Sequence, residues 1–347
     1  MGEREYKQWR ALMDPLVDKK AHLKLGGIDV RVISVQESPR RSKLQSAAHA
    51  CGFGAEQLVF VDAVDGRNLT EVPVKKRSRS ASNCASNCSR YVEAVTGLTI
   101  IDGGTTKCSA LEIASSASHV MAVHAASQAG LDRVLICEDD VHLGALAAWQ
   151  LSLDDVILKA PAKWGGLALF RSSVSPDMAE FSSWSESVSH NWGVVCYLLN
   201  KAGMKDILSK YKVDNTIKFG TDFSKAVPDA VIPHGITNGY VVSSVGLPPD
   251  LFNSTGAINA NHKELHMRAA SAQICRLLRP GRSHDQFTHL RVSPSTPPPH
   301  GLDVMLTGPA RMWMASGCRT TSNSRLSMHA WSIRAGFARY QHLHLKP

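Results

Sequence analysis

Three consecutive carboxylates, Glu138, Asp139 and Asp140, are the strongest candidates for chemistry in this sequence. They directly follow Arg133–Cys137, which is apolar after its first residue and is typical of a buried parallel strand. In an open α/β sheet, ligands gather outside the carboxyl ends of such strands. Adjacent carboxylates repel one another, and a divalent cation would relieve that repulsion. The cluster therefore predicts a Mn²⁺ or Mg²⁺ site with Asp139 and Asp140 as metal ligands; a solvated acidic turn is the alternative.

Two arginines near the end of the first apolar strand could complement such a site. Arg40 and Arg41 follow the β-branched run Asp29–Val35. Guanidinium groups pair well with phosphate, so we expect either arginine to contact the phosphates or the nucleotide of a bound donor. The alternative is that both belong to an exposed helix start.

The elements that must position these residues alternate between strands and helices. Ser38 and Pro39 open a helix after the first strand, and Leu58–Val61 is a second strand. The sequence Ser109-Ala-Leu-Glu112 matches a capping box and predicts a helix to about Gln128, followed by the strand at Arg133. Strand, helix and strand at this spacing predict a doubly wound, Rossmann-like α/β sheet with helices on both faces.

Later elements are shorter. We expect a helix at Lys201–Lys210 and strands at four further segments: Gly166–Phe170, Gly193–Leu199, Ala230–Ile232 and Tyr240–Val245.

The chain divides into three parts by composition. Residues 1–27 predict a helical segment with a stop at Gly26-Gly27, and residues 28–275 form the main domain. Within that domain, 71–108 is polar and predicts a long surface loop or insertion. Residues 276–347 have no periodicity, are rich in Pro, Ser and His, and predict an irregular, disordered tail.

The net charge of +9 belongs almost wholly to this tail, which carries nine Arg and one Lys against two Asp, a net charge of +8. The first 275 residues are nearly neutral, so nucleic-acid binding is not expected of the main domain. No apolar run is long enough for a membrane span, and the N-terminus lacks a signal-peptide core. We therefore expect a cytoplasmic protein, or one of the endomembrane lumen if a targeting segment is missing. Cys137 and Cys196 lie in apolar runs and are expected to be reduced core residues.

Several of these segments resemble the family 25 glycosyltransferases, which include lipooligosaccharide and collagen galactosyltransferases. The stretch ALEIASSASHVMAVHAASQAGLDRVLICEDDVHL is similar to that family's helix with a Ser-His pair, Gly turn and strand ending in Glu-Asp-Asp. VISVQESPRR, FVDAVDGR and GVVCYLLNKAG resemble its opening strand, its Ala-x-Asp-Gly element and its Tyr-Leu strand with the following turn. The resemblance covers residues 29 to about 260; the family's usual Gly-Cys before the Ser-His pair is Ala114-Ser115 here.

The resemblance implies a GT-A fold, a divalent metal and a nucleotide-sugar donor, usually UDP-galactose or UDP-glucose. It implies transfer to a hydroxyl acceptor on a glycan or protein, with inversion at the anomeric carbon. It assigns Ser118, His119 and Glu138 to the donor site. Because inversion needs a base for the acceptor hydroxyl, Asp222 and Asp214 are the candidate catalytic residues, with Asp222 preferred. A helix cap or a loop carboxylate is the alternative for either.

Two other functions fit the same residues. Another metal-dependent nucleotide or phosphoryl-transfer enzyme would use the same carboxylates. A non-catalytic interaction protein would keep a degenerate GT-A scaffold and bind polyanions through the basic tail.

Overall fold

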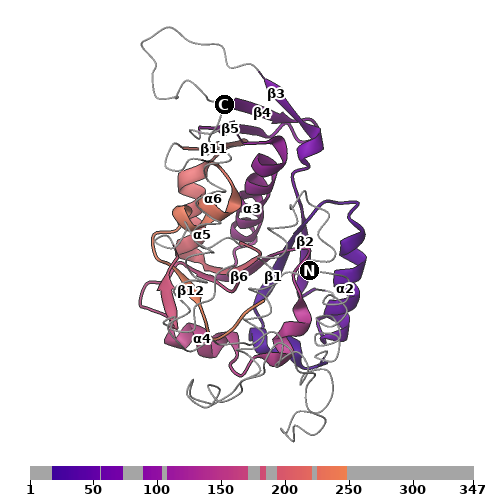
Figure 1. The fold of residues 1–347 in the computed structure, drawn as a ribbon, viewed down its shortest axis with the longest axis vertical. Coiled ribbons are helices and arrows are strands. Elements are labelled where there is room, and N and C mark those ends of the chain that lie inside the picture. The colour runs from indigo at the N-terminus through magenta and orange to yellow at the C-terminus, as the bar shows by residue number, and fades with distance from the viewer. Residues whose placement is uncertain are drawn as a thin grey trace, which may run out of the picture. The chain divides into compact units, whose positions relative to one another are not determined.

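A computed structural model describes residues 18–54, 56–72, 89–103, 108–170, 180–184, 194–220 and 225–247 (Figure 1). They form a mixed α/β fold with two mixed β-sheets, which is compatible with a Rossmann-like arrangement. The predicted disordered tail, 276–347, and residues 1–17 of the predicted N-terminal helix lie outside the described residues. No helix in the described ranges is long and apolar enough to cross a membrane.

In the described part of the chain, the larger sheet has seven strands. In spatial order they are β2 (Leu58–Asp62), β1 (Asp29–Ser34), β6 (Arg133–Glu138), β9 (Cys196–Asn200), β7 (Gly166–Ala168), β12 (Gly239–Val242) and β8 (Phe181–Ser183). Strand β1 pairs in parallel with both β2 and β6, as a doubly wound sheet requires. The carboxyl ends of these three strands therefore meet at one edge.

The larger sheet is mixed rather than uniformly parallel. Strand β9 is antiparallel to its neighbours β6 and β7, and β8 is antiparallel to β12. A central strand such as β9 is apolar on both faces, so its sequence pattern does not distinguish a parallel from an antiparallel direction. Its direction depends on where the chain enters the sheet, which local periodicity does not reveal.

The second sheet takes two of its strands from 71–108, the segment predicted as a long surface loop or an insertion. Its strands, in spatial order, are β10 (Lys212–Val213), β11 (Thr216–Phe219), β5 (Thr99–Asp102), β4 (Ser89–Glu93) and β3 (Leu69–Val72). In β4, Ser89, Tyr91 and Glu93 are buried while Arg90 between them is exposed. The polar residues Ser89 and Glu93 occupy inward positions, so this alternation does not stand out as hydrophobic.

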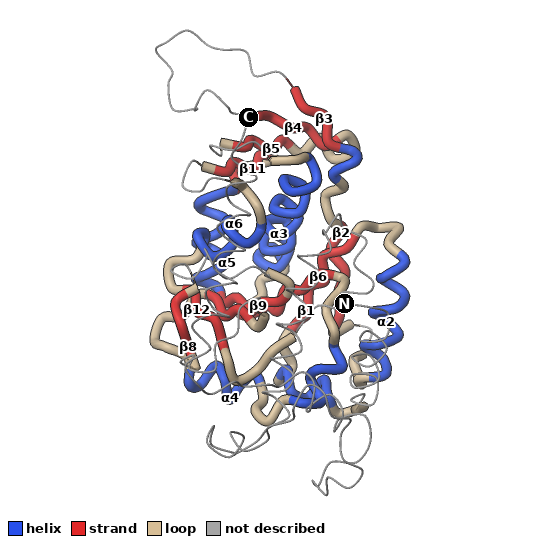
Figure 2. Tube along the Cα trace, in the orientation of Figure 1, coloured by secondary structure: helices blue, strands red, loops and turns tan. Residues whose placement is uncertain are grey.

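Helix α3 (Ala110–Gln128) links the two sheets (Figure 2). It contacts β5 of the smaller sheet and β1, β2 and β6 of the larger one. Its predicted capping box is confirmed: the Ser109 hydroxyl accepts from the Glu112 amide, and the Glu112 carboxylate accepts from the Ser109 amide. A run of small residues lets helices α5 (Lys201–Tyr211) and α6 (Pro228–Gly235) pack against it.

Helix α6 contains Ala230–Ile232, which we expected to be a strand, so that prediction is wrong. Pro228 lies in the first turn of the helix and Asp229 follows it. Both residues favour a helix start, because proline needs no amide partner there and a carboxylate interacts well with the helix dipole. The three-residue apolar run, with β-branched residues only at Val231 and Ile232, was too short to outweigh these two signals.

The remaining helices agree with local signals. Helix α2 (Pro39–Ala50) begins at the N-cap Ser38, and α4 (Leu153–Lys159) has a capping box of its own. The 3-10 helices are η2 (Ala21–Leu25), η3 (Gly66–Asn68) and η4 (Leu143–Ala148). Gly26 ends η2 in the left-handed region with a φ of 62°, as expected of the predicted stop.

Candidate functional site

The carboxylate of Asp139 joins three elements at the carboxyl edge of the larger sheet. Its Oδ2 accepts hydrogen bonds from Ser34 Oγ at 2.6 Å and Ser38 Oγ at 2.9 Å. Its Oδ1 accepts from Arg40 Nη1 at 2.8 Å. The Arg40 and Asp139 side chains are only 14% and 11% exposed, so this is a largely desolvated ion pair. The end of β1, the start of α2 and the end of β6 are thereby tied together.

Arg41 contacts the ends of β1 and β2. Its Nη2 donates to the Ser34 carbonyl at 2.6 Å and to Asp62 Oδ1 at 2.5 Å. Its guanidinium carbon lies 5.1 Å from the centre of the Phe60 ring, a cation–π distance. The two predicted donor arginines thus separate: Arg40 reaches the acidic cluster, while Arg41 links β1 to β2.

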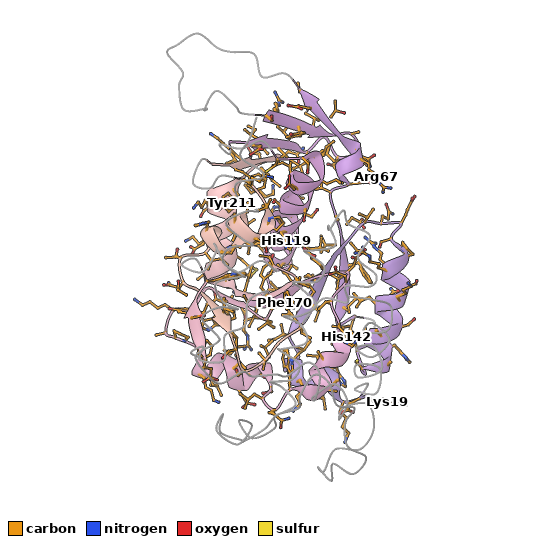
Figure 3. The ribbon with its side chains drawn as sticks, in the orientation of Figure 1. Lys19, Arg67, His119, His142, Phe170 and Tyr211 are labelled. Atoms are coloured by element: carbon orange, nitrogen blue, oxygen red, sulfur yellow. The ribbon has the colours of Figure 1, made fainter. Side chains whose placement is uncertain are left out.

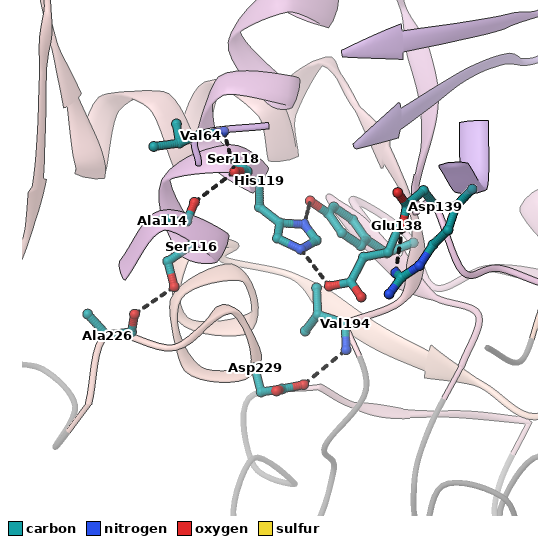
Figure 4. A network of polar contacts seen from close by, with 12 residues as sticks. Val64, Ala114, Ser116, Ser118, His119, Glu138, Asp139, Val194, Ala226 and Asp229 are labelled. Carbon is teal, nitrogen blue, oxygen red and sulfur yellow. Dashed lines mark hydrogen bonds and ion pairs between the residues drawn. The ribbon is translucent and has the colours of Figure 1, made fainter. Parts of the chain in front are cut away.

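His119 lies at the centre of a buried hydrogen-bonded chain (Figures 3 and 4). Its Nε2 lies 3.1 Å from Glu138 Oε1, and its Nδ1 lies 3.0 Å from Tyr197 Oη. The ring is 1% exposed, whereas the Glu138 side chain is 33% exposed. Helix α3, strand β6 and strand β9 therefore each contribute one member, and Glu138 connects the chain to the surface.

Burial makes His119 and Glu138 neutral near pH 7. Burial lowers the pKa of His119 to about 4. Burial, and then the nearby Asp229 and Asp139 carboxylates, raise the pKa of Glu138 to about 8, although Arg40 opposes the shift. A neutral carboxyl and a neutral imidazole share one hydrogen bond, in which either group can donate, depending on the imidazole tautomer. Glu138 is consequently suited to donate a hydrogen bond or a proton rather than to serve as a permanent negative charge.

Two further carboxylates complete this region. Asp140 is 7% exposed, and Asp229 at the start of α6 accepts from the Val194 amide at 2.9 Å. Figure 4 shows Asp229 on the same side of His119 as Glu138. Sequence reasoning missed Asp229 because its segment was interpreted as a strand. The Val-Pro-Asp sequence, typical of a helix start, was the signal that could have found it.

Sequence reasoning also gave Tyr197, Ser34 and Ser38 no role in the site. Tyr197 belongs to the Tyr-Leu motif, which gives its hydroxyl no specific role. Burial raises the pKa of this hydroxyl well above the usual value, so it stays protonated. The two serines are common residues at a strand end and a helix cap, and no sequence signal distinguishes them.

Ser118 fixes the scaffold from a buried position, 2% exposed. Its hydroxyl donates to the Ala114 carbonyl at 2.7 Å and accepts from the Val64 amide at 2.9 Å. This pair of bonds holds the loop after β2 against α3. The hydroxyl of Ser118, a predicted donor-site residue, is therefore engaged by two backbone groups.

Of the two candidate bases, only Asp214 lies within the described residues. Asp214 lies in the exposed turn between β10 and β11 of the smaller sheet, with a φ of 49°. An Asp tolerates the left-handed region well, which accounts for this residue type in the turn. Asp222, the preferred candidate, lies outside the described residues.

The carboxylate of Asp139, a predicted metal ligand, is engaged by protein groups. Both oxygens of that carboxylate accept protein hydrogen bonds. Across the described ranges, no group of three or more His, Cys, Asp and Glu side chains could hold a metal ion. Comparison with known proteins adds no assignment, since no protein-family model and no curated protein matches this chain.

Proposed function

We propose that this chain is a glycosyltransferase that moves a sugar, galactose or glucose, from a UDP-sugar to a hydroxyl acceptor on a glycan or protein. The observation that carries the proposal is the meeting of segments that are far apart in sequence. Arg40 bonds Asp139, Ser118 bonds the loop of the Ala-x-Asp-Gly element, and His119 bonds both Glu138 and Tyr197. Every segment on which the family resemblance rests contributes to this one connected set.

The sheet edge supports a GT-A type of donor site. Strands β2, β1 and β6 end there in parallel, and α2 begins beside them. Ligands of open α/β sheets bind at such edges. The order of the larger sheet, with β9 reversed beside three parallel strands, is compatible with that fold.

Each residue near this edge has a role in the proposal. Arg40 is the cation best situated to meet the diphosphate, although it must leave Asp139 to do so. Neutral Glu138, held by His119, would hydrogen-bond a hydroxyl or phosphate oxygen of the donor. Asp222 stays the preferred base for the acceptor hydroxyl. As this oxygen attacks the anomeric carbon, the base takes its proton and UDP departs from the opposite face.

A divalent cation, Mn²⁺ or Mg²⁺, is part of this proposal. Asp140 would hold it, since carboxylate oxygens suit hard cations, whereas Asp139 fits less well because its oxygens already accept three hydrogen bonds. Such an ion would neutralise the charge that develops on the diphosphate leaving group.

The engagement of Asp139 also favours a second candidate, a non-catalytic interaction protein on the same scaffold. Its two oxygens are used to hold β1, α2 and β6 together, which is a structural task. On this alternative, deletion of residues 276–347 abolishes a salt-sensitive association with polyanions. On the proposal we favour, the same deletion leaves donor hydrolysis intact.

An assay of UDP release tests the proposal. The full chain is incubated with UDP-galactose or UDP-glucose and Mn²⁺, with EDTA as the metal-free arm. We expect release with one donor, loss of release in EDTA, and at least a tenfold reduction in Asp140→Asn. Asp132→Asn is the matched control, because Asp132 precedes β6 at the opposite end of the same strand and is exposed. No release with any donor would contradict enzymatic function.

A further inference from the structure

Two cysteines face each other across β6 and β9, and each directly precedes a hydrogen-bonding partner of His119 in sequence. The Sγ atoms of Cys137 and Cys196 lie 2.8 Å apart, and their Cα atoms are register partners. Both side chains are fully buried and are free thiols. A disulfide bond is about 2.05 Å long, so the two sulfurs lie less than about 1 Å beyond bonding distance.

The register makes this pair geometrically suitable for a bond. One step along the ladder, the Glu138 amide donates to the Val195 carbonyl at 2.8 Å, which marks that pair as the hydrogen-bonded one. Because the two kinds of pair alternate, Cys137 and Cys196 form a non-hydrogen-bonded pair. Cα atoms in such pairs lie about 4.5 Å apart, within the range of about 4.4–6.8 Å that disulfides span. The backbone therefore needs little movement.

We propose that Cys137 and Cys196 are a site of cross-strand disulfide formation, at which a disulfide oxidant such as oxidised glutathione joins β6 to β9. The two thiols react with one molecule of glutathione disulfide. The bond between Cys137 and Cys196 forms, the sulfur–sulfur bond of glutathione breaks, and both thiol hydrogens pass to the glutathione sulfurs. The products are one protein disulfide and two molecules of reduced glutathione.

The bond would act on the candidate site through the next residues along each strand. Glu138 follows Cys137, and Tyr197 follows Cys196; these residues are the two partners of His119. A covalent link between β6 and β9 would fix the spacing of those partners. Since both sulfurs are fully buried, the oxidant meets them when the strands are apart, so the bond forms faster during folding than in the folded chain.

The bond is detected by peptide mapping of the full chain. The reduced protein is unfolded, refolded at a series of glutathione disulfide to glutathione ratios, blocked with N-ethylmaleimide and digested. A folded sample is treated in parallel with glutathione disulfide in dilute urea, so that the test does not depend on refolding. We expect a Cys137–Cys196 peptide pair that separates on reduction, and a melting temperature raised by about 5 °C or more.

Variants separate this pair from the other cysteines. Cys137→Ser and Cys196→Ser each abolish the linked peptide and the rise in melting temperature. Cys51→Ser preserves both, because Cys51 is buried elsewhere, at the end of α2. In the oxidised wild type, exchange of the Glu138 amide hydrogen with solvent slows. The proposal is overturned if both cysteines remain fully blocked with maleimide in every sample, or if they link to other cysteines instead.

Discussion

The Nε2 atom of His119 lies 3.1 Å from Oε1 of Glu138, and the two groups are neutral together near pH 7. One hydrogen bond between neutral groups, rather than a salt bridge, joins the pair, because burial disfavours both charges and the Asp229 and Asp139 carboxylates oppose ionisation of Glu138. The site therefore contains a carboxyl group, that of Glu138, which can donate a hydrogen bond or a proton.

Glu138→Gln changes how stability depends on pH. The pKa of Glu138 is raised to about 8, so the folded protein retains a proton that the unfolded protein loses near the ordinary pKa of 4.5. This contribution is present below about pH 4.5 and is lost as pH rises toward 8. The free energy of unfolding of the wild type should fall over this window relative to that of Glu138→Gln, as measured by urea unfolding at pH 5, 6.5 and 8.

His119 is expected to make the same contribution to the free energy of unfolding in the wild type and in Glu138→Gln. The pKa of His119 is lowered to about 4, so its contribution is present above about pH 6.5 and is lost as pH falls. Glu56→Gln, at an exposed position, is the control and should track the wild type. A wild type and a Glu138→Gln variant with parallel stability profiles would show that Glu138 ionises normally.

Arg40 and Asp139 should be energetically coupled. In a double-mutant cycle of Arg40→Met and Asp139→Asn, we expect a coupling of about 1.5–3 kcal/mol, because the pair is largely desolvated. The exposed Lys201–Asp132 pair is the control, with no measurable coupling expected. Chemical unfolding of the four chains measures each term. Additive effects at Arg40 and Asp139 would mean that the pair does not hold β1, α2 and β6 together.

Gly203→Ala should destabilise the fold even though alanine is the better helix former. A Cβ at Gly203 would lie 2.1 Å from the Gly165 carbonyl oxygen, so α5 would have to move away from the chain entering β7. We expect a loss of about 3 kcal/mol or more, or a failure to fold. At Gly130, with a φ of 68° and open space around a Cβ, alanine should cost only about 1–2 kcal/mol. Equal melting temperatures for the two variants would refute this packing.

The sequence predicted the elements that have local signals. Ser109 and Glu112 carry a complete capping box, and Ser38-Pro39 carries a cap and a first-turn proline, so α3 and α2 begin where expected. The apolar run before Glu138 fixed β6 in the same way. These signals act over three or four residues and do not depend on distant parts of the chain.

The features that the sequence did not predict depend on contacts between residues far apart in the chain. The direction of β9 follows from its pairing with β6 and β7, and β4 exists because it pairs with β3 and β5. The same holds for the site. Local signals predicted that Glu138 ends a strand and that His119 lies within a helix. The bond from Arg40 to Asp139, across 99 positions of sequence, was not predicted. Asp229 was not predictable as a site residue, because the sequence predicted a strand directly after it where the structure has helix α6.

The two candidate bases can be separated by kinetics. Asp222→Asn should slow sugar transfer by about 100-fold or more while donor binding is unchanged, because a base acts on the acceptor hydroxyl. Asp214→Asn should leave the rate within about twofold, since Asp214 lies in an exposed turn of the smaller sheet and Asn tolerates its φ. Initial rates with saturating donor give both numbers. A large loss in Asp214→Asn alone would reverse the assignment.

A thermal-shift screen of nucleotide sugars with Mn²⁺ tests the central claim most directly. Ligand binding to the folded chain raises its melting temperature in proportion to affinity and concentration. The account predicts a rise with one UDP-sugar that is lost in Asp140→Asn and kept in Asp132→Asn. A melting temperature that no nucleotide sugar changes, or a rise that survives Asp140→Asn, would contradict a donor site at the Glu138–Asp140 edge.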